Sequence, residues 1–333
     1  MTERRQPRVL CVGLVTLDVV QTVDRLPTSN VKQQALGLSV DFGGPAANAA
    51  GVVAGLGGDV RLLTALGASP AAGAVRGYLK QAGVETLDLA RPGVQQAFAV
   101  STVLVEQATG DRAVVSTNAG DERVTTVGEE SAPEGAEAET DEDLIDQVTW
   151  ADVVLVDGHH MSLGLAVVRA ARAVGTPVVF DGGSWKPRTQ ELLRLVDVAV
   201  VSDDFAAPSG TVTDLMRSAG VPAFGQSRGH LPWTLEVGTE QHVINVQAVP
   251  PAEMVDTLGA GDVLHGALAY SLASARLQVG AETRGLEGVD IVAAARFASE
   301  KASLSCRSAG ARGWLDQSRG RRYRGSRPPR PVG

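Results

Sequence analysis

The chain of 333 residues is poor in cysteine and in aromatic side chains, and it has no long apolar run. Its two cysteines, Cys11 and Cys306, are too few for a disulfide framework or a zinc site, which favours a reducing, cytoplasmic location. No stretch approaches the roughly 18 to 20 apolar residues that a membrane helix needs, and the N-terminus does not resemble a signal peptide. We therefore expect a soluble protein without a membrane partner.

The charge balance is acidic, with 38 Asp and Glu against 30 Lys and Arg, so no nucleic-acid partner is expected. Hydrophobic residues make up 44% of the sequence, which is enough to bury a core and excludes a disordered polymer. Residues 129–143 contain eight carboxylates and no basic residue, and they predict a solvated acidic loop. Residues 317–333 contain six arginines, and they predict a disordered tail after a packed domain over 8–316.

Short apolar runs alternate with segments of helical periodicity. The runs predict strands at Val9–Val15, Val60–Leu66, Val153–Asp157, Val178–Asp181 and Val198–Val201, and the periodic segments predict helices at Ala46–Leu56, Ala71–Gln81, Leu163–Ala173 and Glu191–Leu195. This order indicates an α/β fold with a mostly parallel sheet, helices on both faces, and ligands beyond the carboxyl ends of the strands. Alternating polar and apolar residues in Val19–Ser39 and Ala97–Val115 predict antiparallel strands that meet in a small β lid.

The sharpest motif is DTLGAGD, from Asp256 to Asp262, which leads into a helix with small residues on one face. Gly259, Ala260 and Gly261 leave backbone N–H groups uncovered at the positive end of the helix dipole, an arrangement that suits an anion. Asp262 in the first turn is placed to take a proton from a hydroxyl that attacks a phosphoryl group. The alternative is a glycine turn whose aspartate only caps the helix. The chain has no GxxxxGK[ST] loop, so the P-loop route to ATP is excluded.

This heptad resembles the C-terminal signature of the ribokinase-like, or PfkB-type, carbohydrate kinases. Gly43, Gly44 and Asn48 resemble the N-terminal GG-x-x-x-N signature of that family, and Asp18 resembles the aspartate that follows its first strand. The resemblance covers residues 8–316 and implies a three-layer α/β/α sandwich with a small β-sheet lid, whose strands lie within about 18–40 and 96–117. It also implies ATP-dependent phosphorylation of a primary hydroxyl, and the motifs are most similar to those of fructose-type and sulfofructose kinases and ketohexokinases.

By this resemblance Asp262 is the general base, and Gly259, Ala260 and Gly261 form the anion hole. The substrate sugar would be held by Asp18, Gly43, Gly44, Asn48 and, from the lid, Arg112 and Lys32. ATP would contact Ser227, Gly229, Lys186 and the closing CRSAGARG loop with Cys306 and Gly310. Asp256 resembles the acid that helps arrange a monovalent cation such as K⁺.

The resemblance also implies Mg²⁺ as a cofactor and a homodimer through the lid. The sequence departs from the family on the nucleotide side. Ser202–Phe205 stands where an Asn-x-x-Glu motif helps to position magnesium, and His230–Trp233 replaces a glycine pattern. The expected substrate is a ketohexose-like sugar. The alternatives are a kinase for another sugar acid or a nucleoside, and a sugar-binding pseudokinase or regulator without turnover.

Overall fold

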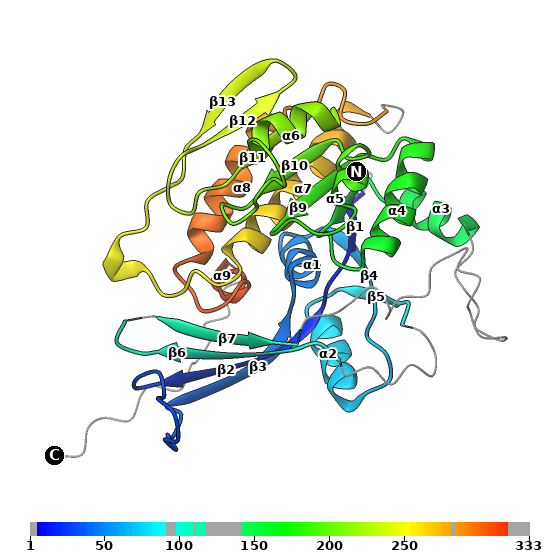
Figure 1. The fold of residues 1–333 in the computed structure, drawn as a ribbon. Coiled ribbons are helices and arrows are strands. Elements are labelled where there is room, and N and C mark those ends of the chain that lie inside the picture. The colour runs from blue at the N-terminus through cyan, green and yellow to red at the C-terminus, as the bar shows by residue number, and fades with distance from the viewer. Residues whose placement is uncertain (1–4, 91–97, 110, 118–140, 281–283, 319–333) are drawn as a thin grey trace.

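The computed structural model describes residues 5–90, 98–109, 111–117, 141–280 and 284–318. The large sheet contains β1 (Arg8–Val12), β4 (Asp59–Thr64), β5 (Glu85–Asp88), β8 (Val153–Val156), β9 (Val178–Gly182), β10 (Val198–Val201), β11 (Ala223–Gln226), β12 (Trp233–Val237) and β13 (Glu240–Ile244). Its strand order is β13-β12-β11-β10-β9-β8-β1-β4-β5 (Figure 1). The strands from β11 to β5 are parallel, and β12 and β13 extend one edge in antiparallel fashion. The mostly parallel sheet predicted from the alternating runs is confirmed.

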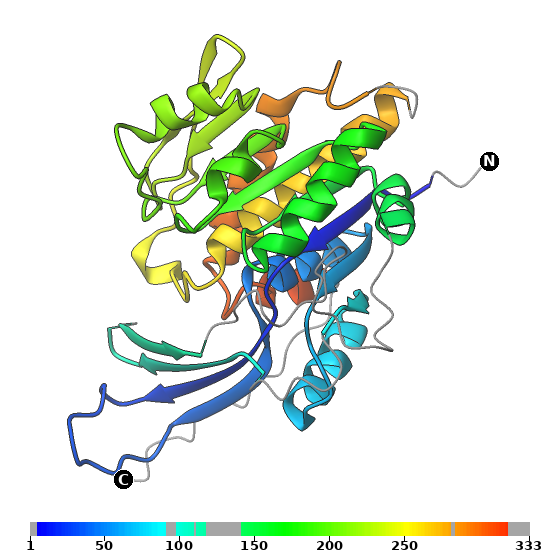
Figure 2. The ribbon, with the colours of Figure 1, turned by 45° about the vertical axis from the view of Figure 1, so that its right-hand side comes forward.

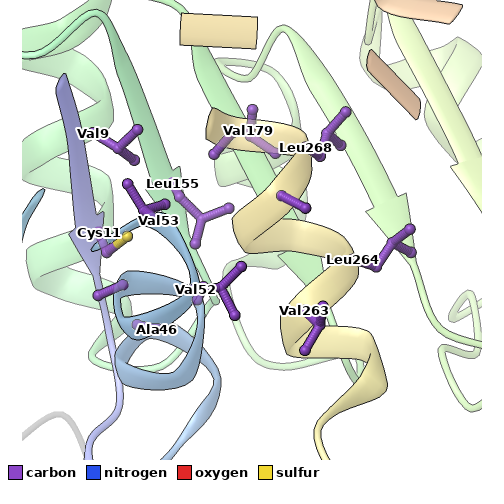
Figure 3. Packing of buried hydrophobic residues seen from close by; sticks show 14 of the residues in the cluster. Val9, Cys11, Ala46, Val52, Val53, Leu155, Val179, Val263, Leu264 and Leu268 are labelled. Carbon is purple, nitrogen blue, oxygen red and sulfur yellow. The ribbon is translucent and has the colours of Figure 1, made fainter. Parts of the chain in front are cut away.

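Helices cover both faces of this sheet and produce three layers (Figure 2). Alternate side chains of β1 enter different cores, since Val9 and Cys11 belong to one buried cluster and Leu10 and Val12 to the other. Figure 3 shows the first cluster, in which β1 faces helices of one layer. That layer contains α1 (Pro45–Gly55), α2 (Pro70–Gln81), α7 (Ala260–Val279), α8 (Ile291–Ser305) and α9 (Gly313–Ser318). The opposite layer contains α3 (Asp141–Trp150), α4 (Met161–Val174), α5 (Thr189–Leu193) and α6 (Val212–Ala219).

A separate four-stranded sheet, in the order β3-β2-β6-β7, projects from the body (Figure 1). Its strands are β2 (Thr16–Val23), β3 (Gly37–Gly43), β6 (Val100–Glu106) and β7 (Arg112–Ser116). Both hairpins are antiparallel, as predicted, but they join each other through β2 and β6, which run parallel. The small β lid is therefore as predicted, and the parallel contact between its two hairpins is an additional feature. β2 and β6 are parallel because both start at the body, where Leu17 N donates to Ala99 O, and both run outward.

Several predicted boundaries also shift. β1 ends at Val12 instead of Val15, because Gly13 follows with φ +148° and its α-carbon packs against the carboxylate of Asp157. Residues 141–143 of the predicted acidic loop belong to α3, and the rest of that loop lies outside the described residues. α9 extends to Ser318, so the predicted tail begins inside a helix, and residues 319–333 are not described. In the described part of the chain, no helix is long and apolar enough to cross a membrane.

Candidate active site

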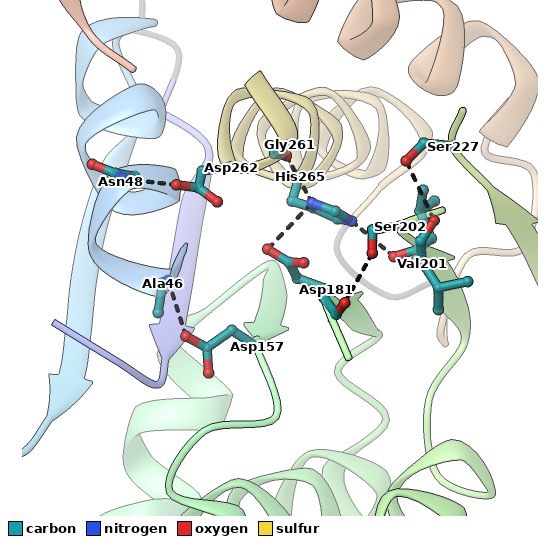
Figure 4. Close-up of polar contacts among 12 residues, drawn as sticks. Ala46, Asn48, Asp157, Asp181, Val201, Ser202, Ser227, Gly261, Asp262 and His265 are labelled. Carbon is teal, nitrogen blue, oxygen red and sulfur yellow. Dashed lines mark hydrogen bonds and ion pairs between the residues drawn. The ribbon is translucent and has the colours of Figure 1, made fainter. Parts of the chain in front are cut away.

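The two family-like motifs meet between the beginnings of two helices, although 214 positions separate their key side chains. Asn48 lies in the first turn of α1, and Asp262 lies in the first turn of α7. The side-chain amide of Asn48 donates to Oδ2 of Asp262 at 2.6 Å (Figure 4). The carboxyl ends of β1, β8 and β9 reach the same region, as expected for ligand sites in parallel sheets.

Asp262 has an environment that keeps its proton affinity high. Burial raises its pKa to about 7, and the nearby carboxylate of Asp181 acts in the same direction. The hydrogen bond from Asn48 and the ring of His265 oppose this shift. A carboxylate whose pKa lies near neutral pH is well suited to accept a proton from an alcohol during a reaction.

The start of α7 is open toward the outside. Its N-cap residue, Gly259, has φ +76°, and no side chain caps the helix. A Cβ atom at Gly259 would lie 2.6 Å from the Cβ of Ala311, so glycine is required there on two counts. A Cβ atom at Gly261 would meet nothing within 4 Å. Ala260 N–H donates to the Thr257 carbonyl at 3.3 Å, and Gly261 borders open space. An exposed amide at the start of a helix is the geometry that binds a phosphate group.

Glycines at the other motif bring polar groups close together. A Cβ atom at Gly43 would lie 2.0 Å from a carboxylate oxygen of Asp18, which shows that this side chain packs directly on the Gly43 backbone. Asp18 is held by the hydroxyl of Thr16 at 2.5 Å, and burial raises its pKa. Gly44 has φ +93° and lies against the backbone of Leu14, where a Cβ atom would be 2.5 Å from the carbonyl oxygen.

Arg312 belongs to this site, although the family resemblance assigns its loop, CRSAGARG, to the nucleotide. Its guanidinium donates to the side-chain oxygen of Asn48, to Asp41 Oδ2 at 2.6 Å and to the Phe42 carbonyl at 3.0 Å. It also lies over the ring of Phe42, with 3.5 Å between the guanidinium carbon and the ring centroid. Gly51 leaves the space for it, because a Cβ atom there would be 2.6 Å from Arg312 Cδ. The sequence feature that could have indicated Arg312 is its position directly after the Gly-Ala of CRSAGARG.

Asp157 is a second residue that the sequence analysis missed. It follows β8, is buried, and accepts hydrogen bonds from the backbone N–H groups of Leu14 at 2.8 Å, Ala46 at 3.1 Å and His159 at 2.8 Å. Burial opposes its charge, but His159 and these hydrogen bonds outweigh burial and lower its pKa. One carboxylate thus ties the end of β1 to the start of α1. A strand-ending aspartate before a glycine was the signal for it.

Asp256 connects the DTLGAGD motif to the closing loop. Its two carboxylate oxygens accept the N–H groups of Leu258 at 2.8 Å and Gly310 at 2.9 Å, and its own N–H points to the carbonyl of Cys306 at 3.2 Å. From the lid, Arg112 donates to Thr257 at 3.3 Å and lies 3.8 Å from Asp256. The structure therefore brings Asp256, Gly310, Cys306 and Arg112 together. The occupancy of this place by K⁺ stays a prediction.

The remaining residues of the predicted site have no hydrogen bond or ion pair with Asp262 in the described part of the chain. Lys32 is in the exposed connection between β2 and β3, and no hydrogen bond or ion pair joins it to the other site residues in the described part of the chain. Ser227 donates to the Val201 carbonyl at 3.3 Å, and Gly229 lies in the following turn with φ +57°. Lys186 follows β9 and acts electrostatically on Asp181. Their contacts to ATP stay predictions.

The described residues do not build a protein cage for magnesium. Ser202 donates to the Gly183 carbonyl at 2.8 Å, and Asp203 and Asp204 are exposed. Among the residues that the structure describes, no group of three or more His, Cys, Asp or Glu side chains could hold a metal ion. That magnesium binds mainly through phosphate oxygens and water stays a prediction.

Comparison with known proteins finds relatives over most of the chain. The model of the pfkB family carbohydrate kinases matches residues 6–207 and 234–317. A ribokinase of Bacillus subtilis is 27% identical over 315 residues, which cover 92% of this chain and 96% of that protein. Ketohexokinase of Mus musculus is 23% identical over 309 residues, with 86% of this chain and 98% of the mouse protein covered.

Solved structures show the same fold. A crystal structure of a ribokinase candidate from Agrobacterium tumefaciens superposes with a TM-score of 0.73 at 26% identity, over 95% of this chain and 97% of that chain. The ribokinase of Arabidopsis thaliana, complexed with ribose and ATP, has a TM-score of 0.66 at 22% identity, over 94% of this chain and 98% of that chain. The fold is thus ribokinase-like, and the chain belongs to the PfkB family of carbohydrate kinases, which are phosphotransferases with an alcohol group as acceptor.

Proposed function

We propose that this kinase transfers the γ-phosphoryl group of ATP to a primary hydroxyl of a neutral, ketohexose-like sugar. The observation that carries this proposal is the contact between Asn48 and Asp262 beside the uncapped start of α7. It places a carboxylate with a pKa raised to about 7 next to amides that suit a phosphate.

In this reaction Asp18, Gly43, Gly44 and Asn48 hold the sugar. Asp262 accepts the proton of the attacking hydroxyl, so that the oxygen becomes a better nucleophile as the new O–P bond forms. The amides at Gly259–Gly261 stabilise the charge that the transferring group spreads over its oxygens. Bound ATP supplies the phosphoryl group, and its magnesium ion offsets phosphate charge.

The charged side chains around the proposed sugar-binding residues favour a neutral substrate. Asp18, Asp41 and Asp262 bring three carboxylates there, against the single guanidinium of Arg312. That guanidinium is already engaged by Asn48, Asp41 and the Phe42 carbonyl. An acid group beside Asn48 would meet these carboxylates and a guanidinium that is already paired, so a neutral sugar is favoured at this end of the site. The other described cations predicted for the sugar, Lys32 and Arg112, belong to the lid.

A nucleoside substrate is also disfavoured. A base normally stacks on an aromatic ring, and the described aromatic ring beside Asn48 is that of Phe42. Arg312 covers that ring at 3.5 Å, and Phe42 is buried. Similarity to the mouse protein named ketohexokinase supports the choice of a ketohexose, whereas the protein named ribokinase keeps a pentose in the panel of substrates to test.

ADP release over a panel of sugars tests the proposal. We expect turnover with a neutral ketohexose, weaker turnover with ribose and aldohexoses, and none with sugar acids, sulfonated sugars or nucleosides. The preferred use of an acidic sugar or a nucleoside would overturn the substrate class. Thermal stabilisation by sugars without ADP release would indicate a binding protein and overturn the proposed turnover.

We further propose that two copies associate through the lid in the cytoplasm. Leu38, Val40 and Val115 lie on one face of the small sheet, as the strand registers place them, and their side chains are 68%, 36% and 73% exposed. Burying such a face between two copies removes apolar surface from water. Light scattering should give a dimer mass, and Val115→Asp should shift it to a monomer while Val243→Asp, on β13, should not.

A further inference from the structure

His265 lies in the core beneath the first turn of α7 (Figure 4). Its side chain is 3% exposed. Nδ1 is 2.7 Å from the carbonyl oxygen of Gly261, and Nε2 is 2.8 Å from the carbonyl oxygen of Val200. Carbonyl oxygens only accept hydrogen bonds, and both ring nitrogens of a histidine are donors only in the charged imidazolium form.

A counter-ion lies beside the ring. Asp181, at the end of β9, is buried and places Oδ2 at 3.2 Å from Nδ1 of His265. Burial raises the pKa of Asp181 to about 8, with a further contribution from Asp157, which follows β8, while burial lowers the pKa of His265. His159 and Lys186 oppose the shift of Asp181, and Asp262 opposes that of His265. Burial thus favours the neutral pair, with one proton on Asp181 at neutral pH, and the hydrogen-bond contacts of the ring act against it.

The surroundings of the ring decide where this proton resides. If Asp181 held it, one ring nitrogen would direct a lone pair at a carbonyl oxygen only 2.7 or 2.8 Å away. If His265 holds it, both carbonyls receive a donor and the carboxylate of Asp181 faces a cation. The second arrangement gives both carbonyls a donor and puts a cation beside Asp181 Oδ2, a buried atom without a hydrogen-bond partner in the described part of the chain. The first arrangement leaves a repulsive contact in a buried place.

We propose that His265 is an imidazolium paired with the carboxylate of Asp181, and that it is a positioning residue for phosphoryl transfer. The second half of this proposal rests on the proposed function. The charged N–H group at Nδ1 polarises the carbonyl of Gly261, and the same peptide unit carries the N–H of Asp262 at the start of the helix. The imidazolium also counters the carboxylate of Asp181, so the base Asp262 loses its proton more readily.

The protonation state can be read directly by ¹H–¹⁵N correlation spectra of the histidine side chains in the full chain at pH 7. We expect two protonated ring nitrogens for His265, with its signal assigned by its loss in His265→Gln. Asp181→Asn has the shape of a protonated carboxyl but carries no charge, so one ring nitrogen of His265 should lose its proton in that variant.

A neutral His265 in the wild type, or a His265 spectrum unchanged by Asp181→Asn, would overturn the ion pair. If His265→Gln does not fold, the difference between the wild type and Asp181→Asn assigns the signal instead. This measurement needs no substrate and no turnover, so it stands or fails separately from the kinase activity.

Kinetics test the positioning role. Gln at position 265 keeps an N–H donor but removes the charge, so we expect kcat to fall about 10-fold while the KM for sugar changes less than about twofold. His242→Gln on β13 is the matched control, because that side chain is 30% exposed and pairs with Glu240. Equal kcat values for the two variants, with rates normalised to folded protein, would show that His265 has only a structural role.

Discussion

The guanidinium of Arg312 donates to the side-chain oxygen of Asn48, which leaves the amide nitrogen of Asn48 to face Asp262. An asparagine side chain can otherwise rotate and exchange its oxygen with its nitrogen. Arg312 thus determines that Asn48 presents a donor, and not an acceptor, to the carboxylate. By this contact the CRSAGARG loop, residues 306–313, orients Asn48 of the N-terminal GG-x-x-x-N motif.

Removal of this guanidinium should weaken sugar binding. In Arg312→Gln the Asn48 amide is free to turn, and Asp41 loses its cationic partner at 2.6 Å. We expect the KM for sugar to rise about 10-fold, equivalent to about 1.4 kcal/mol, because charged hydrogen bonds are lost. Arg307→Gln, in the same loop but paired with Glu253 at 3.4 Å, is the control and should leave KM unchanged. An unaltered KM in Arg312→Gln would show that Asn48 is oriented without Arg312.

The pH dependence of kcat/KM should report on Asp262. Only the ionised carboxylate can accept a proton, and its pKa in the free enzyme is raised to about 7. The rate should therefore fall as pH drops below about 7 and level off above it. Asp262→Asn should bind sugar normally, lose about 10² to 10⁴-fold in kcat and lose this acid limb. An acid limb that persists in Asp262→Asn would assign the titration to another group.

Asp157 should contribute to stability more than to chemistry. An asparagine there has a single acceptor oxygen, whereas the native carboxylate uses Oδ2 for Leu14 and Ala46 and Oδ1 for His159. We expect Asp157→Asn to lose about 2 to 3 kcal/mol of unfolding free energy in urea titrations at pH 7. Because the folded pKa is lowered, this contribution is complete at neutral pH and disappears as pH falls through that pKa. Asp203→Asn, at an exposed position, should leave the unfolding free energy unchanged. Equal urea midpoints for Asp157→Asn and Asp203→Asn would show that Asp157 does not stabilise the link between β1 and α1.

The sequence predicts those parts of the fold that depend on local pattern. The apolar run Val198–Val201 gave β10 with the same bounds, because a strand buried on both faces needs four consecutive apolar residues. The parallel contact of β2 with β6 was not predictable in this way, since it depends on where two hairpins leave the body.

The site residues likewise include some that a local sequence pattern predicts and others that it does not. Glycines and carboxylates in DTLGAGD and GGPAAN carry a recognisable spacing, so Asp262 and Asn48 could be chosen from the sequence. The role of Arg312 was not predicted, because its partner Asn48 lies 264 positions away and the Gly-Ala-Arg pattern does not show which residue the guanidinium contacts. The same holds for His265 and Asp181, whose relation exists only once α7 packs on the sheet.

Two neighbouring glycines at the start of α7 should respond to alanine in opposite ways. Gly259→Ala would put a side chain into a left-handed conformation at φ +76° and 2.6 Å from the Cβ of Ala311, so we expect a loss of at least about 2 kcal/mol of stability. Gly261→Ala meets no atom within 4 Å and favours the helix, so its stability should rise by up to about 1 kcal/mol.

The activity of Gly261→Ala should nevertheless fall, because its methyl group enters the open space beside the first turn of α7, where we propose that the phosphate binds. We expect the KM for ATP to rise about 10-fold or more, with the KM for sugar unchanged. Thermal unfolding and initial rates on the same preparation separate the two effects. Since the variant is at least as stable as the wild type, any loss of rate comes from the site itself. Full activity in Gly261→Ala would place the phosphate away from the first turn of α7.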